Sequence, residues 1–304
     1  MSKHLFGVIA TPYGIAANNR GENEGNITTL QKLLWHGEIH TTVSAEAIRW
    51  AIRYYWQRQG IPVNREWLET ENDHKWNDPR WLAWTDPSGK GKDQARLIDD
   101  DVLGYMVAEA AKDDGSDKPG SAIKRRGPLE VTRAVSLTPF VGDITFNAKS
   151  GNKTNTSLYG TEVHATRYQY GFGLTPQHLH TPANALKLVD AVAGLAEVAG
   201  NQSRFLFDFS PEAVVFRWTD DFAPRLLYGF APVGENKLGL PDVLGRLDMG
   251  DLDPTELVVG VGRLDLLTDQ TLATLAKHGL QPLGIVNAAA EVKTRIGRDL
   301  GIAS

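Results

Sequence analysis

The order of apolar segments along the chain constrains its fold more than any other feature of the sequence. Apolar runs bounded by proline or glycine predict strands, and apolar residues that recur every three or four positions predict helices. In order, the expected elements are a strand at 3–11, a helix at 44–58, strands at 131–147 and 161–173, a helix at 182–199 and a strand at 213–218. This order is close to a βαββαβ unit, so the expected fold class is α+β.

Two segments lie outside this unit. Residues 60–130 are expected to form an inserted subdomain with a mobile end, and their run Asp99-Asp100-Asp101 is typical of a solvated loop. The main domain then comprises residues 1–59 and 131–304. Towards the C-terminus, the expected elements are a strand through Phe205, Phe207 and Phe209, a strand at 256–262, a helix at 268–278 capped by Thr268, and a helix at 286–298.

The composition excludes several classes of protein. The 304-residue chain contains no cysteine, which excludes disulfides, thiolate metal sites and cysteine nucleophiles. It contains no run of about 18 apolar residues, so a membrane span is not expected. Residues 1–7 lead directly into strand-like sequence without a charged leader, so we expect a cytoplasmic protein rather than a secreted one.

Charge is distributed along the chain in blocks. The formal net charge of −5 by itself argues against a nucleic-acid binder. However, residues 1–65 carry 7 basic and 4 acidic side chains, and residues 118–180 carry 8 and 3. Between them, residues 66–117 carry 6 basic and 14 acidic side chains. Two basic zones therefore flank an acidic insert, which permits one face that attracts a polyanion, although blocks of this size also arise by chance.

The common catalytic and cofactor motifs are absent or incomplete. Gly260-Val261-Gly262 follows a predicted strand but lacks the third glycine of a dinucleotide site. His36 and His40 are four residues apart, but Gly37 disfavours a helix there and no HExxH motif is formed. Neither GxxxxGK[ST] nor GxSxG occurs. We therefore expect no enzyme activity, no metal and no cofactor.

Two basic elements suit the backbone of a nucleic acid. Ser44 is a good N-cap for the helix at 44–58, whose first N–H groups can meet a phosphate. The core face of that helix is expected to hold Ile48, Ile52 and Tyr55, with Arg49, Arg53 and Trp56 on a neighbouring stripe. The strands at 131–147 and 161–173 are expected to form a long hairpin with a polar tip at 150–157, whereas the Gly/Asn-rich residues 13–28 are expected to form a loop.

Two sets of residues resemble the DevR-type CRISPR-associated Cas-seven family. The first set comprises Phe6–Pro12, the loop Asn18–Asn26 and the helix start Thr42–Arg53. The second comprises Gly142–Asn147 and Tyr159–Tyr170, which resemble the thumb hairpin of that family. Both sets occur in the family's order, within roughly residues 5–218.

The resemblance implies a hand-shaped protein. Its parts are an RRM/ferredoxin-like palm at 1–59 and 131–304, an inserted finger region at 60–130 and a β-hairpin thumb at about 142–174. The implied function is that of a non-catalytic, guide-RNA-binding backbone subunit of a type I Cascade close to the I-B branch. Copies of such a subunit polymerise along CRISPR RNA and support its pairing with target DNA. The implied partners are guide RNA, target DNA, further copies of the chain, and Cascade subunits of the Cas-five, Cas-eight and small-subunit types.

Backbone recognition requires positive charge and hydrogen-bond donors rather than a code for base edges. The residues expected to bind guide RNA are Asn18, Asn19, Arg20, Asn26, Ser44, Arg49, Arg53, Phe146, Lys149, Lys153, Arg167 and Gln169. Those expected to guide target DNA are Lys124, Arg125 and Arg126. Simpler interpretations stay open: Arg53 as a solvated helix arginine, Phe146 as a core residue, and residues 124–126 as a solvated cluster.

Two other functions fit parts of the sequence. Related type III backbone subunits resemble this chain but cut target RNA, using an aspartate in the loop after the first strand. Residues 13–30 contain no aspartate, so a metal-dependent endoribonuclease would have to use Glu22, Glu24 or His36. The third hypothesis is a transcriptional or developmental regulator, because DevR-type names carry that implication.

Overall fold

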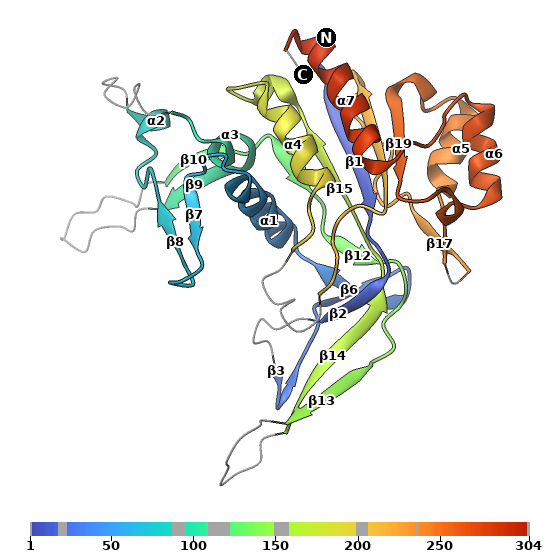
Figure 1. The fold of residues 1–304 in the computed structure, drawn as a ribbon, viewed down its shortest axis with the longest axis horizontal. Helices are drawn as coiled ribbons and strands as arrows, with labels where there is room; N and C mark the ends of the chain where they lie inside the picture. Colours follow the sequence, from blue (N-terminus) through green and yellow to red (C-terminus); the bar gives the residue numbers. More distant parts are fainter. Residues whose placement is uncertain are drawn as a thin grey trace.

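The protein consists of a large central sheet, helices packed against it and a smaller sheet that extends away from it (Figure 1). The expected α+β class is confirmed. The computed structural model describes residues 2–17, 23–86, 95–108, 122–148, 158–198, 206–234 and 236–302.

The central sheet contains eight strands. They are β1 (His4–Ala10), β5 (Lys32–Trp35), β6 (Glu38–Val43), β11 (Leu129–Val131), β12 (Ala134–Ser136), β15 (Tyr168–Leu174), β16 (Ala213–Thr219) and β19 (Leu257–Val261). Their order is β19-β16-β1-β15-β12-β6-β5, with β11 also paired to β15. Strand β1 is antiparallel to both of its neighbours, with Val8 opposite Gly171 and Val215. The strands expected at 3–11, 213–218 and 256–262 are confirmed.

Helices cover both faces of this sheet. They are α1 (Ala45–Arg58), α4 (Asn184–Ala193), α5 (Pro241–Met249), α6 (Asp269–Lys277) and α7 (Ile285–Leu300). Because side chains alternate along a strand, Leu5 and Ile9 of β1 join the core with α1, α4 and α7. Phe6 and Val8 point the other way, into the core with α5 and α6. Every residue of β1 is therefore buried.

Helix α1 begins and ends where its sequence predicts. The Ser44 side chain accepts a hydrogen bond from the Ala47 N–H at 3.2 Å, which makes it the N-cap. Ile48 and Ile52 are buried as expected, but the placement of Trp56 beside the arginines is wrong. Trp56 follows Ile48 and Ile52 at the same four-residue spacing, so it is fully buried, and its indole N–H donates to the Lys187 carbonyl at 3.1 Å.

A second sheet, called here the hairpin sheet, extends away from the central sheet (Figure 1). Its strands are β2 (Gly14–Ala17), β3 (Asn23–Glu24), β4 (Ile27–Thr28), β13 (Ile144–Ala148) and β14 (Leu158–Thr166). The expected loop at 13–28 thus contains three short strands. The strand expected at 161–173 is divided at Arg167, so that β14 pairs with β13 in the hairpin sheet while β15 enters the central sheet.

Segment 60–130 lies beside α1, away from the centre of the main sheet (Figure 1). Its elements are β7 (Arg65–Leu68), β8 (Asp73–Trp76), α2 (Leu82–Thr85), α3 (Ile98–Leu103), β9 (Gly104–Ala108) and β10 (Ala122–Arg126). The prediction of a solvated aspartate loop is wrong. Asp99, Asp100 and Asp101 form the first turn of α3 and are at most 4% exposed, because partners from several elements converge on their carboxylates.

The C-terminal third contains expected and unexpected elements. Helix α6 is capped by Thr268, whose hydroxyl accepts from the Thr271 N–H at 3.1 Å, as predicted. Phe207 and Phe209 form no strand, although both are buried against Tyr168, and Phe205 lies outside the described residues. The remaining elements are β17 (Ala231–Val233), β18 (Lys237–Gly239) and the 3₁₀ turns η2 (Pro176–His178), η3 (Pro254–Glu256) and η4 (Leu264–Leu266). Among the described residues, no helix has both the length and the apolar character to cross a bilayer.

Candidate nucleic-acid interface

The N-terminal turn and the hairpin belong to one sheet. Gly160 of β14 lies opposite Ile27 of β4, and its N–H donates to the carbonyl oxygen of Asn26 at 2.9 Å. Strand β2 pairs with β14 further along (Figure 1). These strands come from the two basic zones of the sequence, which are therefore brought side by side. Five of the expected RNA-binding residues lie outside the described residues, namely Asn18, Asn19, Arg20, Lys149 and Lys153.

An exposed apolar platform occupies the hairpin sheet around Gly160. A Cβ atom at Gly160 would meet Ile144 and Ile27 at 3.1 Å and the Phe146 ring at 3.6 Å, so the glycine leaves the platform flat. Phe146 is 71% exposed, which rules out its interpretation as a core residue. An aromatic ring held on a flat, open strand is a surface on which a base can stack.

A polar groove lies on the edge of the central sheet near the base of the hairpin sheet. It has a volume of about 410 Å³ and is lined by Leu30, Gln31, Lys32, Leu33, Thr42 and Arg133. Glu162 of β14 joins the two sheets here, because it pairs with Lys32 at 2.7 Å and accepts from the Leu30 N–H at 2.7 Å. The groove therefore lies beside the point where Glu162 connects the hairpin sheet to the central sheet.

Arg133 is the most available cation of this groove. It is exposed, and its guanidinium donates to the side-chain oxygens of Gln31 and Thr42 at 3.2 Å each. Within the described ranges it has no carboxylate partner. Sequence reasoning missed Arg133 and Lys32 as binding candidates. The one available signal was their place in the two basic zones, since they come together only when β5 pairs with β6 and β6 pairs with β12.

The two arginines of α1 that were expected to bind RNA have partners within the protein. Arg49 donates to the carbonyl oxygens of Leu129, at 2.7 Å, and Leu103, and burial lowers its pKa. Arg53 pairs with Asp99 at 3.0 Å. Both guanidinium groups thus attach α1 to neighbouring elements, α3 and β11. Their expected contact with RNA stays a prediction, as does that of Ser44, whose hydroxyl already caps the helix.

Arg167 and Gln169 are buried where the two sheets meet. Arg167 pairs with Glu212 at 3.0 Å and lies against the ring of Tyr13 at 5.6 Å. The side-chain oxygen of Gln169 accepts from the Phe230 N–H at 3.2 Å. Both side chains hold neighbouring segments in place, and their expected RNA contact also stays a prediction.

Strand alternation separates the three basic residues of β10. Lys124 and Arg126 are exposed, and Arg126 forms a surface ion pair with Glu130. Arg125 points to the other face, where its guanidinium lies 4.4 Å from the centre of the Trp84 ring and pairs with Asp101 at 2.8 Å. The three therefore do not form one solvated cluster.

The three aspartates of α3 connect segment 60–130 to the rest of the chain. Asp99 accepts from Arg53 and from the backbone N–H groups of Asn64 and Arg65. Asp100 accepts from Trp81 at 2.9 Å and Asn64 at 3.0 Å. Burial, followed by the neighbouring Asp99, raises the pKa of Asp100 to about 7.

Comparison with known proteins decides the family. Residues 13–204 match the family model described as "CRISPR-associated negative auto-regulator DevR/Csa2". A protein of Myxococcus xanthus (strain DK1622), "CRISPR-associated protein Cas7/Cst2/DevR", is 50% identical over 269 residues, which cover 86% of this chain and 87% of that protein. The chain belongs to the Cas7/Cst2/DevR family. The resemblance seen in the sequence is thereby confirmed.

Two solved structures share the fold of this Cas7-family chain. A chain of a "CRISPR RNA-guided surveillance complex" is 16% identical, with a TM-score of 0.55 over 97% of this chain and 100% of that one. A chain of a "CRISPR RNA-guided surveillance complex, pre-nicking" is 12% identical, with a TM-score of 0.56 and the same coverage. At these identities the likeness concerns the fold.

In this Cas7-family chain, the two histidines considered as metal ligands, His36 and His40, lie in different surroundings. His36 follows β5 at the surface, and its ring meets Trp35 edge-on. His40 is buried, with Nδ1 2.7 Å from the Ser136 carbonyl oxygen. Across the part of the chain that the structure describes, no three His, Asp or Glu side chains gather as a metal site. Of the acidic residues considered for RNA cleavage, Glu24 is exposed in β3, and Glu22 lies outside the described residues.

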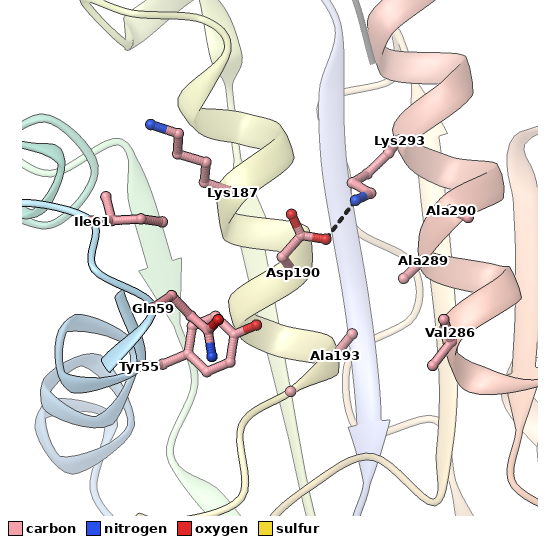
Figure 2. Close-up of a pocket in the computed structure, with 11 residues that line it drawn as sticks. Tyr55, Gln59, Ile61, Lys187, Asp190, Ala193, Val286, Ala289, Ala290 and Lys293 are labelled. Carbon is pink, nitrogen blue, oxygen red and sulfur yellow. Dashed lines mark hydrogen bonds and ion pairs between the residues drawn. The ribbon is translucent and has the colours of Figure 1, made fainter. Parts of the chain in front are cut away.

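A different groove, of about 420 Å³, lies between α1, α4 and α7. Figure 2 shows Tyr55 of α1 and Gln59, the residue after that helix, facing Asp190 of α4, which Lys293 of α7 reaches at 2.5 Å. Ala193, Ala289 and Ala290 contribute small side chains to this groove. Its lining is more apolar than that of the groove with Arg133, so it suits a polyanion less well.

Proposed function

We propose that this Cas7-family protein is a non-catalytic backbone subunit that holds CRISPR RNA in a type I Cascade-like complex. The observation that carries the proposal is the joining of the N-terminal turn and the hairpin in one sheet, beside the groove with Lys32 and Arg133. An RNA strand lying there meets cations for its phosphates and an exposed aromatic ring, which together recognise backbone and stacked bases without reading sequence.

The arrangement of the central sheet supports an RRM-like palm. Taken in sequence, β1, α1, β12, β15, α4 and β16 form a βαββαβ unit. In space its strands run β16-β1-β15-β12, and each neighbouring pair is antiparallel. This order is compatible with a split βαβ fold. We assign residues 1–59 and 131–304 to the palm, with β13 and β14 as its thumb, and residues 60–130 to the finger region.

The assembly belongs to the same proposal. Copies of the chain polymerise along the guide RNA, and the guide pairs with target DNA, so that base pairing supplies the sequence specificity. The further partners we propose are Cascade subunits of the Cas-five, Cas-eight and small-subunit types. The proposal is supported by the two structural relatives, which are chains of CRISPR RNA-guided surveillance complexes.

Filter binding with a short RNA tests the groove. Arg133→Gln removes a cation that has no carboxylate partner among the described residues, and it is expected to weaken binding by about 3- to 10-fold for every RNA sequence and to reduce the salt slope by about one. Lys32→Gln is expected to have a smaller effect, because Lys32 is already paired with Glu162. Arg298→Gln is the matched control, because Arg298 is an exposed arginine on α7. Equal affinities for all three variants and the parent chain would contradict the proposal.

A second assay tests the absence of catalysis. The assembled complex is incubated with labelled target RNA and a divalent metal. The proposal predicts intact target RNA, whereas cleavage at regular intervals would favour the endoribonuclease alternative. Tighter binding of duplex DNA than of RNA by the isolated chain would favour the regulator alternative, which the "auto-regulator" wording of the family description also suggests.

A further inference from the structure

Two guanidinium groups lie against one indole ring where segment 60–130 meets the loop before α4. The Arg125 guanidinium is 4.4 Å and that of Arg96 is 5.1 Å from the centre of the Trp84 ring. His180 closes the group, with its ring edge-on to Trp84 and its Nε2 2.6 Å from Nη1 of Arg96. Four side chains from four separate stretches of sequence thus converge on this point.

The charges of this group are only partly balanced. Asp101 pairs with Arg125 at 2.8 Å, but its carboxylate also accepts from the backbone N–H groups of His180, at 2.8 Å, and Thr181, at 3.0 Å. Arg96 has no carboxylate partner within the described ranges, where its polar partner is the imidazole of His180. Of the two cations, Arg125 is paired with a buried carboxylate, whereas the exposed Arg96 has none among the described residues.

The group also holds hydrogen-bond donors that lack acceptors. Nε of Arg125 and Nε1 of Trp84 are both buried, and neither has a partner among the described residues. Buried donors are normally paired, because leaving one unpaired costs about 1–3 kcal/mol. Both donors match the oxygen acceptors of an anion such as a phosphate.

The surroundings indicate which kind of anion fits. Lys124 and Arg126 are exposed on the opposite face of the same strand, β10, where Arg126 pairs with Glu130, so the ribbon carries positive charge on both faces. A ribbon with cations on both faces suits a polymer of phosphates better than a single small anion. Arginine also presents a planar fork of donors that matches a phosphate.

We infer that Arg96, Arg125, Trp84 and His180 form a binding site for a phosphodiester group of a nucleic-acid strand. The guanidinium groups bind the phosphate oxygens, Trp84 holds the guanidinium groups in place, and Asp101 positions Arg125. The identity of the strand, guide or target, rests on the proposed function. The site differs from the groove with Arg133, because it lies where segment 60–130 meets the loop before α4 and not on the edge of the central sheet.

Direct binding of oligonucleotides to the purified chain tests the site without reference to Cascade. Arg96→Gln is expected to weaken binding of a single strand by about 3- to 10-fold and to lower the salt slope by about one. Arg80→Gln is the matched control, because Arg80 is an exposed arginine of the same segment. Unchanged affinity in Arg96→Gln, or an equal loss in Arg80→Gln, would overturn the inference.

The guide-loaded complex then shows which strand the site holds. If the site holds target DNA, Arg96→Gln weakens target binding while the amount of guide RNA that co-purifies is unchanged. If it holds the guide, the amount of co-purified RNA falls. If no RNA co-purifies with the parent chain, the proposed function fails, and the oligonucleotide measurement still decides the site. His180→Gln, which keeps a polar partner for Arg96, is expected to have a smaller effect than Arg96→Gln.

Discussion

Removal of the Asp101 carboxylate is expected to be among the most damaging single changes in segment 60–130. The side chain is about 1% exposed and accepts four hydrogen bonds, from the Arg125 guanidinium, the Asn184 amide and the N–H groups of His180 and Thr181. All four distances lie between 2.8 and 3.0 Å. Asp101→Ala leaves a largely buried cation and three donors unpaired, which is expected to cost about 3–5 kcal/mol of unfolding free energy.

A double-mutant cycle separates the ion pair from the rest of that cost. Urea unfolding is followed for Asp101→Ala, Arg125→Met and the double variant. The coupling energy is expected to be about 1–3 kcal/mol. The surface pair Arg126–Glu130, whose side chains are 86% and 65% exposed, is the control and is expected to give less than about 1 kcal/mol.

A loss of less than about 1 kcal/mol of unfolding free energy in Asp101→Ala would contradict this prediction, because the carboxylate and its four donors would then contribute little to stability. The prediction is also refuted if the coupling energies of the buried pair and the surface pair are equal. Either result would mean that the donors find water or other acceptors when the carboxylate is removed.

Four further predictions follow from single sites. Between pH 3.8 and about 7, the folded chain holds a proton on Asp100 that the unfolded chain releases, so the free energy of unfolding falls as pH rises through that window. In denaturant titrations Asp100→Asn is expected to flatten this fall, whereas the surface change Asp265→Asn is expected to leave it unchanged. Gly260→Ala places a Cβ 2.8 Å from that of Ala288 and is expected to lower the free energy of unfolding in urea by about 1–3 kcal/mol. An unchanged free energy of unfolding would mean that α7 can move to make room for the added methyl group. Ser44→Ala should cost about 1 kcal/mol through loss of the α1 cap, and Ser44→Asp should restore it. Phe146→Ala should change stability by less than about 0.5 kcal/mol but weaken RNA binding by about 1 kcal/mol or more, and a purely structural Phe146 would show the reverse.

Much of the central fold is predictable from local sequence. Helix α1 shows both its cap and its apolar period, and β1 shows a continuous apolar run, as a strand covered on both faces must. The error at Trp56 came from treating a large amphipathic ring as part of the arginine stripe. The four-residue spacing from Ile52 was the better guide, because burial in a helix follows position rather than residue type.

The misplaced features depend on contacts that are distant in sequence. Asp99 to Asp101 form a run that is typical of a solvated loop, but in the folded chain Asn64, Arg125 and the loop before α4 supply partners for their carboxylates. The division of residues 161–173 at Arg167 between two sheets is likewise set by the partners of each half. Local alternation is the same in both halves and predicts only that each is a strand.

The basic segments that form the candidate site could be predicted from the sequence, but which of their cations are exposed could not. The charge blocks identified the two zones that the hairpin sheet brings together. They did not distinguish Arg49 and Arg53, which contact protein groups, from Arg133, which is exposed beside a groove. A sequence reports how many cations a zone holds, and the folded chain determines which of them are already paired.

The mass of the complexes that the chain forms with RNA tests the central claim most directly. Purified protein is mixed with two unrelated RNAs, one twice the length of the other, and the number of bound chains is measured by native mass spectrometry. The account predicts that the longer RNA carries about twice as many chains, whatever its sequence. A fixed number of chains on both RNAs, or no binding, would contradict the assignment of a backbone subunit.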